Sequence, residues 1–363
     1  MNELLSPSAD AASSASPVSS ARPAPSASSS PNAPDARAVL AALAAGPQRM
    51  LDVGHSRLAH WSFGRGPDVV FVHGWPLHSA TFRKLVPRLA GDFTCHLIDL
   101  PSVGRSESGP NVPSGLLDHA ASLRAAVDAL GLSRYAFLAH DSGGYFARIV
   151  AAADPRVAGL VLGNTEIPGH ESPGVTFVAG LARLPGGGAA LRTALRSAAV
   201  RRSPFGFGGC FEDARSVEGE FGDLFVRPLL ESSAAFEGQL RLLRQLDPRL
   251  IDRLPEAHGR LQAPSLLIWG RRDPFFPIAK ARAMMSQFGG GAVLCEIPRA
   301  KLFAHEDHPE AFAGHALPFL KACFEPARAG AQALKRPLVM HPRRRALGQL
   351  PGGRSTPNAR MRL

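Results

Sequence analysis

The sequence has little of what marks several large classes of protein. It has no apolar run near the ~20 residues that a membrane-spanning helix needs, which argues against a helical membrane protein. Its four cysteines in 363 residues are too few for a disulfide framework, and Cys95 and Cys295 stand in apolar, strand-like runs where a free thiol packs as a small hydrophobe. No charged segment followed by an apolar one opens the chain, so we expect no secretory signal and a cytoplasmic location.

Metal-ligand spacings and phosphate-cradling glycine loops are also lacking, so we expect no metal and no cofactor. Acidic residues are missing from one end of the chain: nine Lys and Arg follow Glu325 with no Asp or Glu among them. Most of the formal net charge of +11 therefore belongs to a basic C-terminal tail over 326–363, and residues 38–325 carry about +3. We expect no specific nucleic-acid partner; the sequence is silent on oligomeric state.

What the chain does contain is an alternation of strands and helices between two tails. Residues 1–37 are almost entirely Ser, Ala and Pro, a composition that predicts disorder, and 38–45 predicts a short helix. The predicted strands are 68–72, 94–100, 135–139, 157–162, 265–269 and 292–297, and the predicted helices are 79–89, 115–130, 143–153, 278–288 and 309–323. Near-continuous apolar strands in such an alternation indicate an α/β fold with a mainly parallel sheet flanked by helices.

One interval, 165–255, breaks the alternation with helices and loops rich in Gly, Arg, Leu and Phe. We interpret it as a helical cap inserted over the carboxyl ends of the strands. The core is then formed by residues 38–164 and 256–325.

A strand-to-helix turn at 138–144, which reads LAHDSGG, is the first candidate site. The sharp turn that presents a nucleophile needs small residues two places before and two places after it. If Asp141 is the nucleophile, those residues are Ala139 and Gly143; if Ser142 is, a histidine occupies the cramped first place. Steric fit therefore favours Asp141 as the nucleophile. If the heptapeptide is taken alone, an ordinary strand-to-helix turn in which Asp141 is the helix N-cap explains it as well.

Two further motifs give the chain a family resemblance. VHGWP at 72–76 follows a strand, and 99–106 reads DLPSVGRS. With the turn, they resemble the α/β-hydrolase superfamily, in particular its Asp-nucleophile branch of haloalkane dehalogenases and epoxide hydrolases, over about residues 52–325. The resemblance implies an oxyanion hole made by the backbone N–H groups of Trp75 and Ser142. It also implies that Asp141 displaces a leaving group to form an alkyl-enzyme ester, which activated water then hydrolyses.

The orienting acid of that family follows a late strand. The segment 264–274, PSLLIWGRRDP, resembles it, and Asp273 stands at the acid's position. Some relatives place the acid after the preceding strand, where this chain has Asn164, so Asp273 is the expected acid. Glu166, two residues further on, is a spare candidate.

The base departs from the family pattern. The expected G-H-F-x-x-E-x-x-P reads KLFAHEDHP at 301–309, which puts Leu302 at the histidine position. Leucine accepts no proton. Three explanations stay open: His305, one helical turn on, swings in; Lys301 or His170 replaces the base; or the hydrolytic step is lost.

The substrate is not named by the sequence. Epoxide hydrolases use tyrosines of the cap, but this chain has only Tyr135 and Tyr145, both outside it; haloalkane dehalogenases have Trp after the nucleophile, where this chain has Ser142. Apolar pocket candidates are the phenylalanines at 177, 205, 207, 211, 221, 225 and 236. We expect a small apolar electrophile, of the haloalkane or epoxide class, cleaved through Asp141, Asp273 and His305. The alternatives are a serine esterase using Ser142 and a binding protein without turnover.

Overall fold

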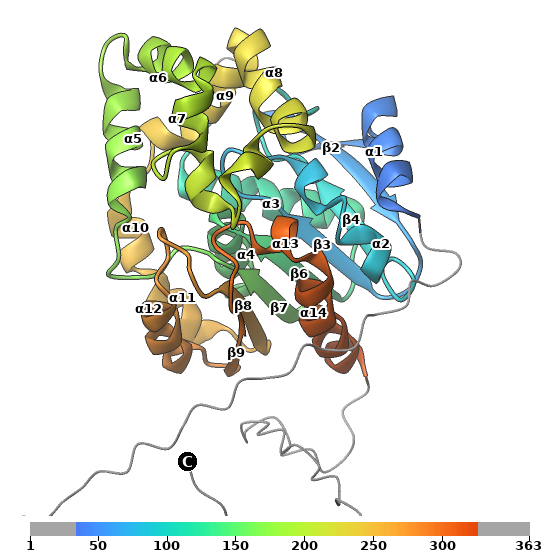
Figure 1. Ribbon diagram of the computed structural model, residues 1–363. Coiled ribbons are helices and arrows are strands. Elements are labelled where there is room, and N and C mark those ends of the chain that lie inside the picture. The colour runs from blue at the N-terminus through green and yellow to red at the C-terminus, as the bar shows by residue number, and fades with distance from the viewer. Residues whose placement is uncertain (1–33, 110, 326–363) are drawn as a thin grey trace, which may run out of the picture. The chain divides into compact units, whose positions relative to one another are not determined.

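The structure is a computed structural model that describes residues 34–109 and 111–325 (Figure 1). A nine-stranded sheet runs through it in the order β1-β2-β4-β3-β6-β7-β8-β9, with β5 paired to β2. The strands are β1 (Arg49–Asp52), β2 (Ser56–Phe63), β3 (Asp68–Val72), β4 (Thr94–Ile98), β5 (Glu107–Ser108), β6 (Tyr135–His140), β7 (Val157–Gly163), β8 (Ser265–Gly270) and β9 (Ala292–Ile297). Pairing is parallel from β4 through β9 and antiparallel at the β1, β2 and β5 edge, which confirms the predicted fold class.

Helices cover both faces of this sheet. In Figure 1, α14 lies in front of the strands, and α3 and α4 lie behind them. The helices are α1 (Ala36–Ala45), α2 (Val86–Leu89), α3 (Leu116–Leu130), α4 (Ser142–Ala151), α5 (Pro173–Arg183), α6 (Gly187–Arg196), α7 (Ala198–Arg202), α8 (Arg227–Glu231), α9 (Ser233–Arg244), α10 (Pro248–Asp252), α11 (Leu254–Arg260), α12 (Ile278–Met284), α13 (Ala304–Asp307) and α14 (Pro309–Phe324). Because helices cover both faces, the central strands are buried on both sides: β6 is buried at every position.

The predicted strands all exist, with ends that differ by at most two residues, but one helix and the limit of the N-terminal tail differ. The helix predicted over 79–89 is a 3₁₀ turn at Ser79–Phe82 followed by the four-residue α2, because Pro87 restricts the residue before it and has no N–H to donate. The predicted disordered tail ends two residues too late, since α1 begins at Ala36, where the Asp35 carboxylate accepts from the Ala38 N–H at 2.7 Å. Strands β1, β2 and β5 were not predicted. Residues 1–33 and the predicted basic tail lie outside the described residues.

The segment 165–255, called the insertion below, supplies the helices α5–α10 between β7 and β8. Helices α5–α9 gather at one end of the sheet, at the top of Figure 1, and α10 lies lower, at the left. They have an apolar cluster of their own, which includes Ala179, Phe236 and Leu240. The next helix, α11, begins inside the predicted limits of the insertion but packs against α4.

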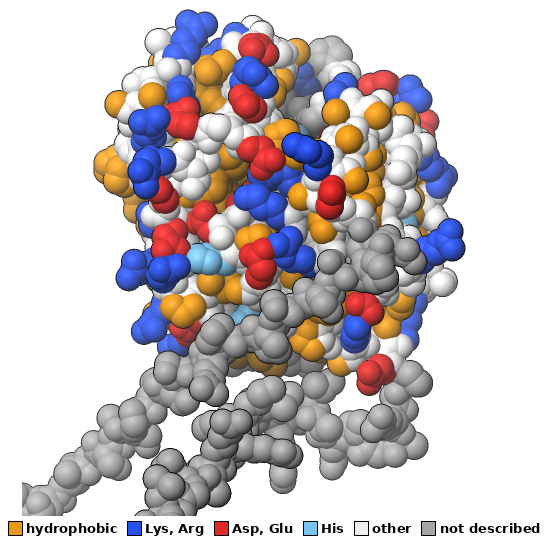
Figure 2. All heavy atoms as spheres, turned by 45° about the vertical axis from the view of Figure 1, so that its right-hand side comes forward, with side chains coloured by type: hydrophobic (Ala, Val, Ile, Leu, Met, Phe, Trp, Pro, Cys, Tyr) orange, Lys and Arg blue, Asp and Glu red, His pale blue; other side chains and the backbone are white. Residues whose placement is uncertain are grey.

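The surface in view in Figure 2 mixes basic, acidic and apolar side chains. On that face, positive charge does not form one uniform area. Among residues 34–109 and 111–325, no helix is both long enough and apolar enough to cross a bilayer.

Candidate active site

The turn between β6 and α4 holds Asp141 in a conformation that few residues adopt. Its backbone has φ 51° and ψ −137°, one of two non-glycine residues with positive φ among those described. Tight packing surrounds it: a Cβ added at Gly143 would lie 2.3 Å from the Val72 carbonyl oxygen, and one at Gly74 would lie 2.4 Å from the Cβ of Asp141. Strain of this kind is retained where a side chain must be aimed.

Backbone N–H groups surround the Asp141 carboxylate. The Trp75 N–H donates to its Oδ2 at 2.9 Å, and the N–H groups of Trp75 and Ser142 both lower its pKa. Burial outweighs them and raises the pKa well above its ordinary value, and the negative charges of Glu166 and Asp273 raise it further.

Ser142, the other candidate nucleophile, is the first residue of α4, one place past the strained position. Its Oγ accepts from the same Trp75 N–H at 3.0 Å. The two candidates therefore share one donor, and of the two only Asp141 has a positive φ.

Asp273 follows β8 and is almost fully buried. Its Oδ2 accepts from Asn164 Nδ2 at 2.5 Å, and its Oδ1 accepts from the Phe275 N–H at 2.7 Å. Asn164 is itself oriented, because its Oδ1 accepts from the Gly270 N–H at 2.9 Å. Burial raises the pKa of Asp273 to about 7 against these hydrogen bonds.

Two cavities reach Asp141. The larger, of about 200 Å³, is mostly apolar and has Leu302 in its lining; the smaller, of about 70 Å³, has polar residues in its wall. Asp141, Trp75, Val175 and Phe276 line both. Of the seven phenylalanines predicted to form the pocket, Phe205, Phe207 and Phe236 line the larger cavity, Phe211, Phe221 and Phe225 are buried in the core, and Phe177 is exposed.

His305 lines neither of these cavities. It is fully buried, and its Nε2 lies 2.6 Å from the Thr81 hydroxyl. Burial and the positive charges of Arg83 and Lys84 lower its pKa to about 3. Its role as a displaced base stays a prediction, which would require the ring to leave the Thr81 contact.

The other replacement bases are placed differently. His170 lines the smaller cavity, with Nε2 2.7 Å from the Phe275 carbonyl oxygen. Lys301 lines neither cavity. The histidine before the nucleophile, His140, lies 2.9 Å through Nε2 from the Leu302 carbonyl oxygen. In the described part of the chain, no group of three or more His, Cys, Asp or Glu is arranged to hold a metal ion.

The structure also places two further residues at the site. Glu166, the spare candidate for the acid, lines the smaller cavity together with Asp141 and Ser142, and Cys210 of the insertion, which the sequence did not point to, lines the larger one. The sequence held a signal for Glu166, because an acidic residue just past the carboxyl end of β7 must lie near the other strand ends. Cys210 had no such signal, since nothing in the sequence fixes how the insertion packs.

A parallel sheet that carries a strained nucleophile turn between a strand and a helix defines an α/β hydrolase. A family model for the alpha/beta hydrolase fold matches residues 67–200. The chain belongs to this superfamily.

Two named proteins are similar in sequence to most of this chain. Haloalkane dehalogenase 2 of Mycobacterium tuberculosis is 31% identical over 274 residues, which cover 73% of this chain and 92% of that protein. A pimeloyl-[acyl-carrier protein] methyl ester esterase of Chromobacterium violaceum is 31% identical over 267 residues, 70% of this chain and 96% of that one. These relatives are hydrolases, and so is this protein.

Solved structures share the fold. An alpha/beta hydrolase fold protein from Burkholderia ambifaria superposes with a TM-score of 0.62 at 26% identity, covering 74% of this chain and 99% of that one. Haloalkane dehalogenase DbeA from Bradyrhizobium elkani gives a TM-score of 0.64 at 23% identity, covering 76% and 97%.

Proposed function

We propose that this hydrolase attacks a small apolar electrophile of the haloalkane or epoxide class through the carboxylate of Asp141. The observation that carries the proposal is the place of Asp141 in the turn. It has the strained conformation, it accepts from the Trp75 N–H, and it lines an apolar cavity of about 200 Å³. A serine nucleophile would be expected at that strained position, and Ser142 is one residue past it.

The first half of the reaction follows from this geometry. An apolar substrate in the larger cavity presents its electrophilic carbon to Asp141, a bond forms between the carboxylate oxygen and that carbon, and the leaving group departs with the electron pair. The Trp75 indole N–H is already used in this structure, because it donates to the Gln239 carbonyl oxygen at 3.0 Å.

The second half needs water to attack the ester carbonyl. The backbone N–H groups of Trp75 and Ser142 would stabilise the resulting oxyanion, a contribution of about 3–4 kcal/mol per donor. Leu302 supplies no base from the expected position, so the ester should accumulate unless another group accepts the proton.

Intact-protein mass spectrometry tests the proposal. The full chain is exposed to 1-bromohexane, styrene oxide and an activated ester, and Asp141→Asn is compared with Ser142→Ala, its neighbour on the same donor. Alkylation mapped to Asp141, lost in Asp141→Asn and kept in Ser142→Ala, supports the proposal. Labelling of Ser142 by a fluorophosphonate probe would instead show the esterase that some relatives suggest. No adduct and no product from any probe would refute it.

A further inference from the structure

The smaller cavity next to Asp141 has a buried carboxylate that the reaction proposed above does not use. Glu166 follows β7, its side chain is 10% exposed, and it lines this cavity together with Asp141 and Ser142. The lining of the cavity is mainly apolar, but these polar side chains belong to it, and its volume of about 70 Å³ has room for water. Water there would lie beside the carbon that must be attacked in the second half-reaction.

The side-chain contacts recorded for Glu166 are made through one of its two carboxylate oxygens. Its Oε2 lies 2.7 Å from the Thr165 hydroxyl and 3.7 Å from Arg148 Nη2, and the carboxylate also has a hydrogen bond from the backbone N–H of Glu166. Arg148 is fully buried and fixed by further bonds to the Gly144 carbonyl oxygen and to His258. Arg148 and Thr165 therefore position Oε2, and no side-chain contact is recorded for Oε1 among the described residues.

The Thr165 hydroxyl lets Glu166 exist in both protonation states. This hydroxyl has one proton and lies 2.8 Å from the Asp141 carbonyl oxygen as well as 2.7 Å from Glu166 Oε2. When Glu166 is ionised, Thr165 donates to it; when Glu166 is protonated, it donates to Thr165, which donates to the Asp141 carbonyl. Both states are satisfied, as a group that takes up and returns a proton requires.

The electrostatics agree with this position. Burial is the largest cause of the raised pKa of Asp141, and the negative charge of Glu166 is the second. The two carboxylates therefore interact electrostatically. Burial also raises the pKa of Glu166 itself. The other titratable or charged groups around the smaller cavity are His170, Glu171 and Asp252.

We propose that Glu166 is the general base of this hydrolase, replacing the histidine that Leu302 displaces. The inference rests on the proposed function, that is, on an ester formed at Asp141. A water molecule in the smaller cavity attacks Cγ of that ester while its proton passes to Glu166. The tetrahedral intermediate then collapses, the bond between Cγ and the alkyl oxygen breaks, and the departing alkoxide receives the proton from Glu166. An alcohol leaves, Glu166 is a carboxylate again, and Asp141 is left as the carboxylic acid, which releases its proton to solvent before the next turnover.

The test separates formation of the Asp141 adduct from its decay. The full chain is pulsed with 1-bromohexane, excess reagent is removed, and the adduct mass and released hexan-1-ol are followed with time. Glu166→Gln is compared with Glu256→Gln, an exposed carboxylate of α11 that lines neither cavity. General-base catalysis contributes ~10²–10⁴-fold, so the adduct should decay at least about 100-fold more slowly in Glu166→Gln and at the wild-type rate in Glu256→Gln.

Each failure has its own signature. Adduct decay in Glu166→Gln at the wild-type rate, or an adduct that never decays in the wild-type protein, would overturn the role of Glu166 and leave Asp141 as the nucleophile. No adduct and no alcohol in any variant would overturn the proposed function itself. A slow decay in His170→Gln with a normal decay in Glu166→Gln would move the base to His170.

Removing a charge next to buried Arg148 could prevent folding, so a second measurement uses the unaltered chain. The decay rate of the wild-type adduct should rise with pH to a plateau as the base loses its proton. In H₂¹⁸O, a single turnover should place the label in the Asp141 carboxylate. A decay rate that falls as the pH rises would overturn the proposal without any variant.

Discussion

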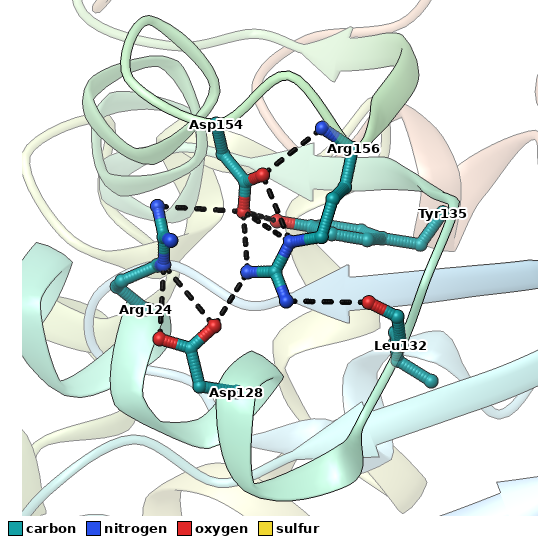
Figure 3. Close-up of polar contacts among 6 residues, drawn as sticks. All are labelled: Arg124, Asp128, Leu132, Tyr135, Asp154 and Arg156. Carbon is teal, nitrogen blue, oxygen red and sulfur yellow. Dashed lines mark hydrogen bonds and ion pairs between the residues drawn. The ribbon is translucent and has the colours of Figure 1, made fainter.

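Asp154 offers a direct test of how this scaffold is stabilised far from the nucleophile. At the amino end of β6, its carboxylate accepts from the Tyr135 hydroxyl at 2.8 Å and from Arg156 Nη2 at 2.7 Å, as Figure 3 shows. Asp128 of α3 binds the same guanidinium. The side chain of Asp154 is completely buried, so these contacts are not exposed to solvent.

The magnitude follows from the pKa of Asp154. Burial alone would raise it, but hydrogen bonds from Arg156 outweigh burial and lower the pKa from 3.8 to about 2. At 1.36 kcal/mol per pKa unit, the ionised group contributes roughly 2 kcal/mol to the free energy of unfolding. Because the folded pKa is the lower one, this contribution is complete above about pH 5, and roughly half remains at pH 3.

Urea denaturation of Asp154→Asn at pH 7 and pH 3 measures it. We expect a loss of about 2 kcal/mol at pH 7 and about 1 kcal/mol at pH 3. Asp213→Asn is the matched control, because Asp213 and Arg215 form the same two-residue pairing at the surface, where exposed pairs contribute under about 1 kcal/mol. Equal losses at both pH values would refute the electrostatic reasoning. The alkylation rate of the folded protein should not change.

Three further predictions concern the site and the loop beside it. Leu302→His should speed decay of the Asp141 adduct by about 10²-fold, if the new ring is held by Asp273 as in the family pattern, and an unchanged decay followed by mass spectrometry would show that it is not. The rate of adduct formation should rise with pH as Asp141, the proposed nucleophile, loses its proton at its raised pKa. Because the negative charge of Glu166 helps to raise that pKa, Glu166→Gln should move the pH profile to lower pH. A shift to higher pH would contradict an electrostatic effect of Glu166 on Asp141. Ser102→Gly should stabilise the fold by up to about 1 kcal/mol, because Ser102 has φ 66° where the family has glycine, and a lower melting temperature would mean that its contact with Arg241 outweighs the strain.

The parallel sheet could be predicted because its strands are short apolar runs, and the local sequence alone shows where such runs begin and end. The segment 68–72 is β3 at the predicted residues, and α3 ends where Gly131 takes φ 71°. The strand β2 was not predicted. Its sequence SRLAHWSF mixes polar and apolar residues, and it forms a strand by pairing with β1 on one side and β4 on the other. Tertiary pairing of this kind leaves little local signal.

The site was predictable to the extent that it lies at strand ends. Asp141 and Asp273 follow β6 and β8, and the parallel register brings the ends of those strands together. The sequence could not show which way His305 faces, because one turn of a short helix decides whether the ring meets the cavity or Thr81. Here it meets Thr81, in a region where Arg83 and Glu306 form a buried ion pair.

Leucine at position 302 changes the electrostatics of the site as well as its base. A histidine there could become a cation between carboxylates and would lower the pKa of both Asp273 and Asp141. Without that cation, burial raises the pKa of both aspartates, and the negative charge of Glu166 raises the pKa of Asp141 further. Glu166 differs from them because Arg148 lies 3.7 Å from its Oε2 and opposes the effect of burial on its pKa. A general base must be ionised to accept a proton, and Arg148 favours that form of Glu166 at a site that has lost the imidazole.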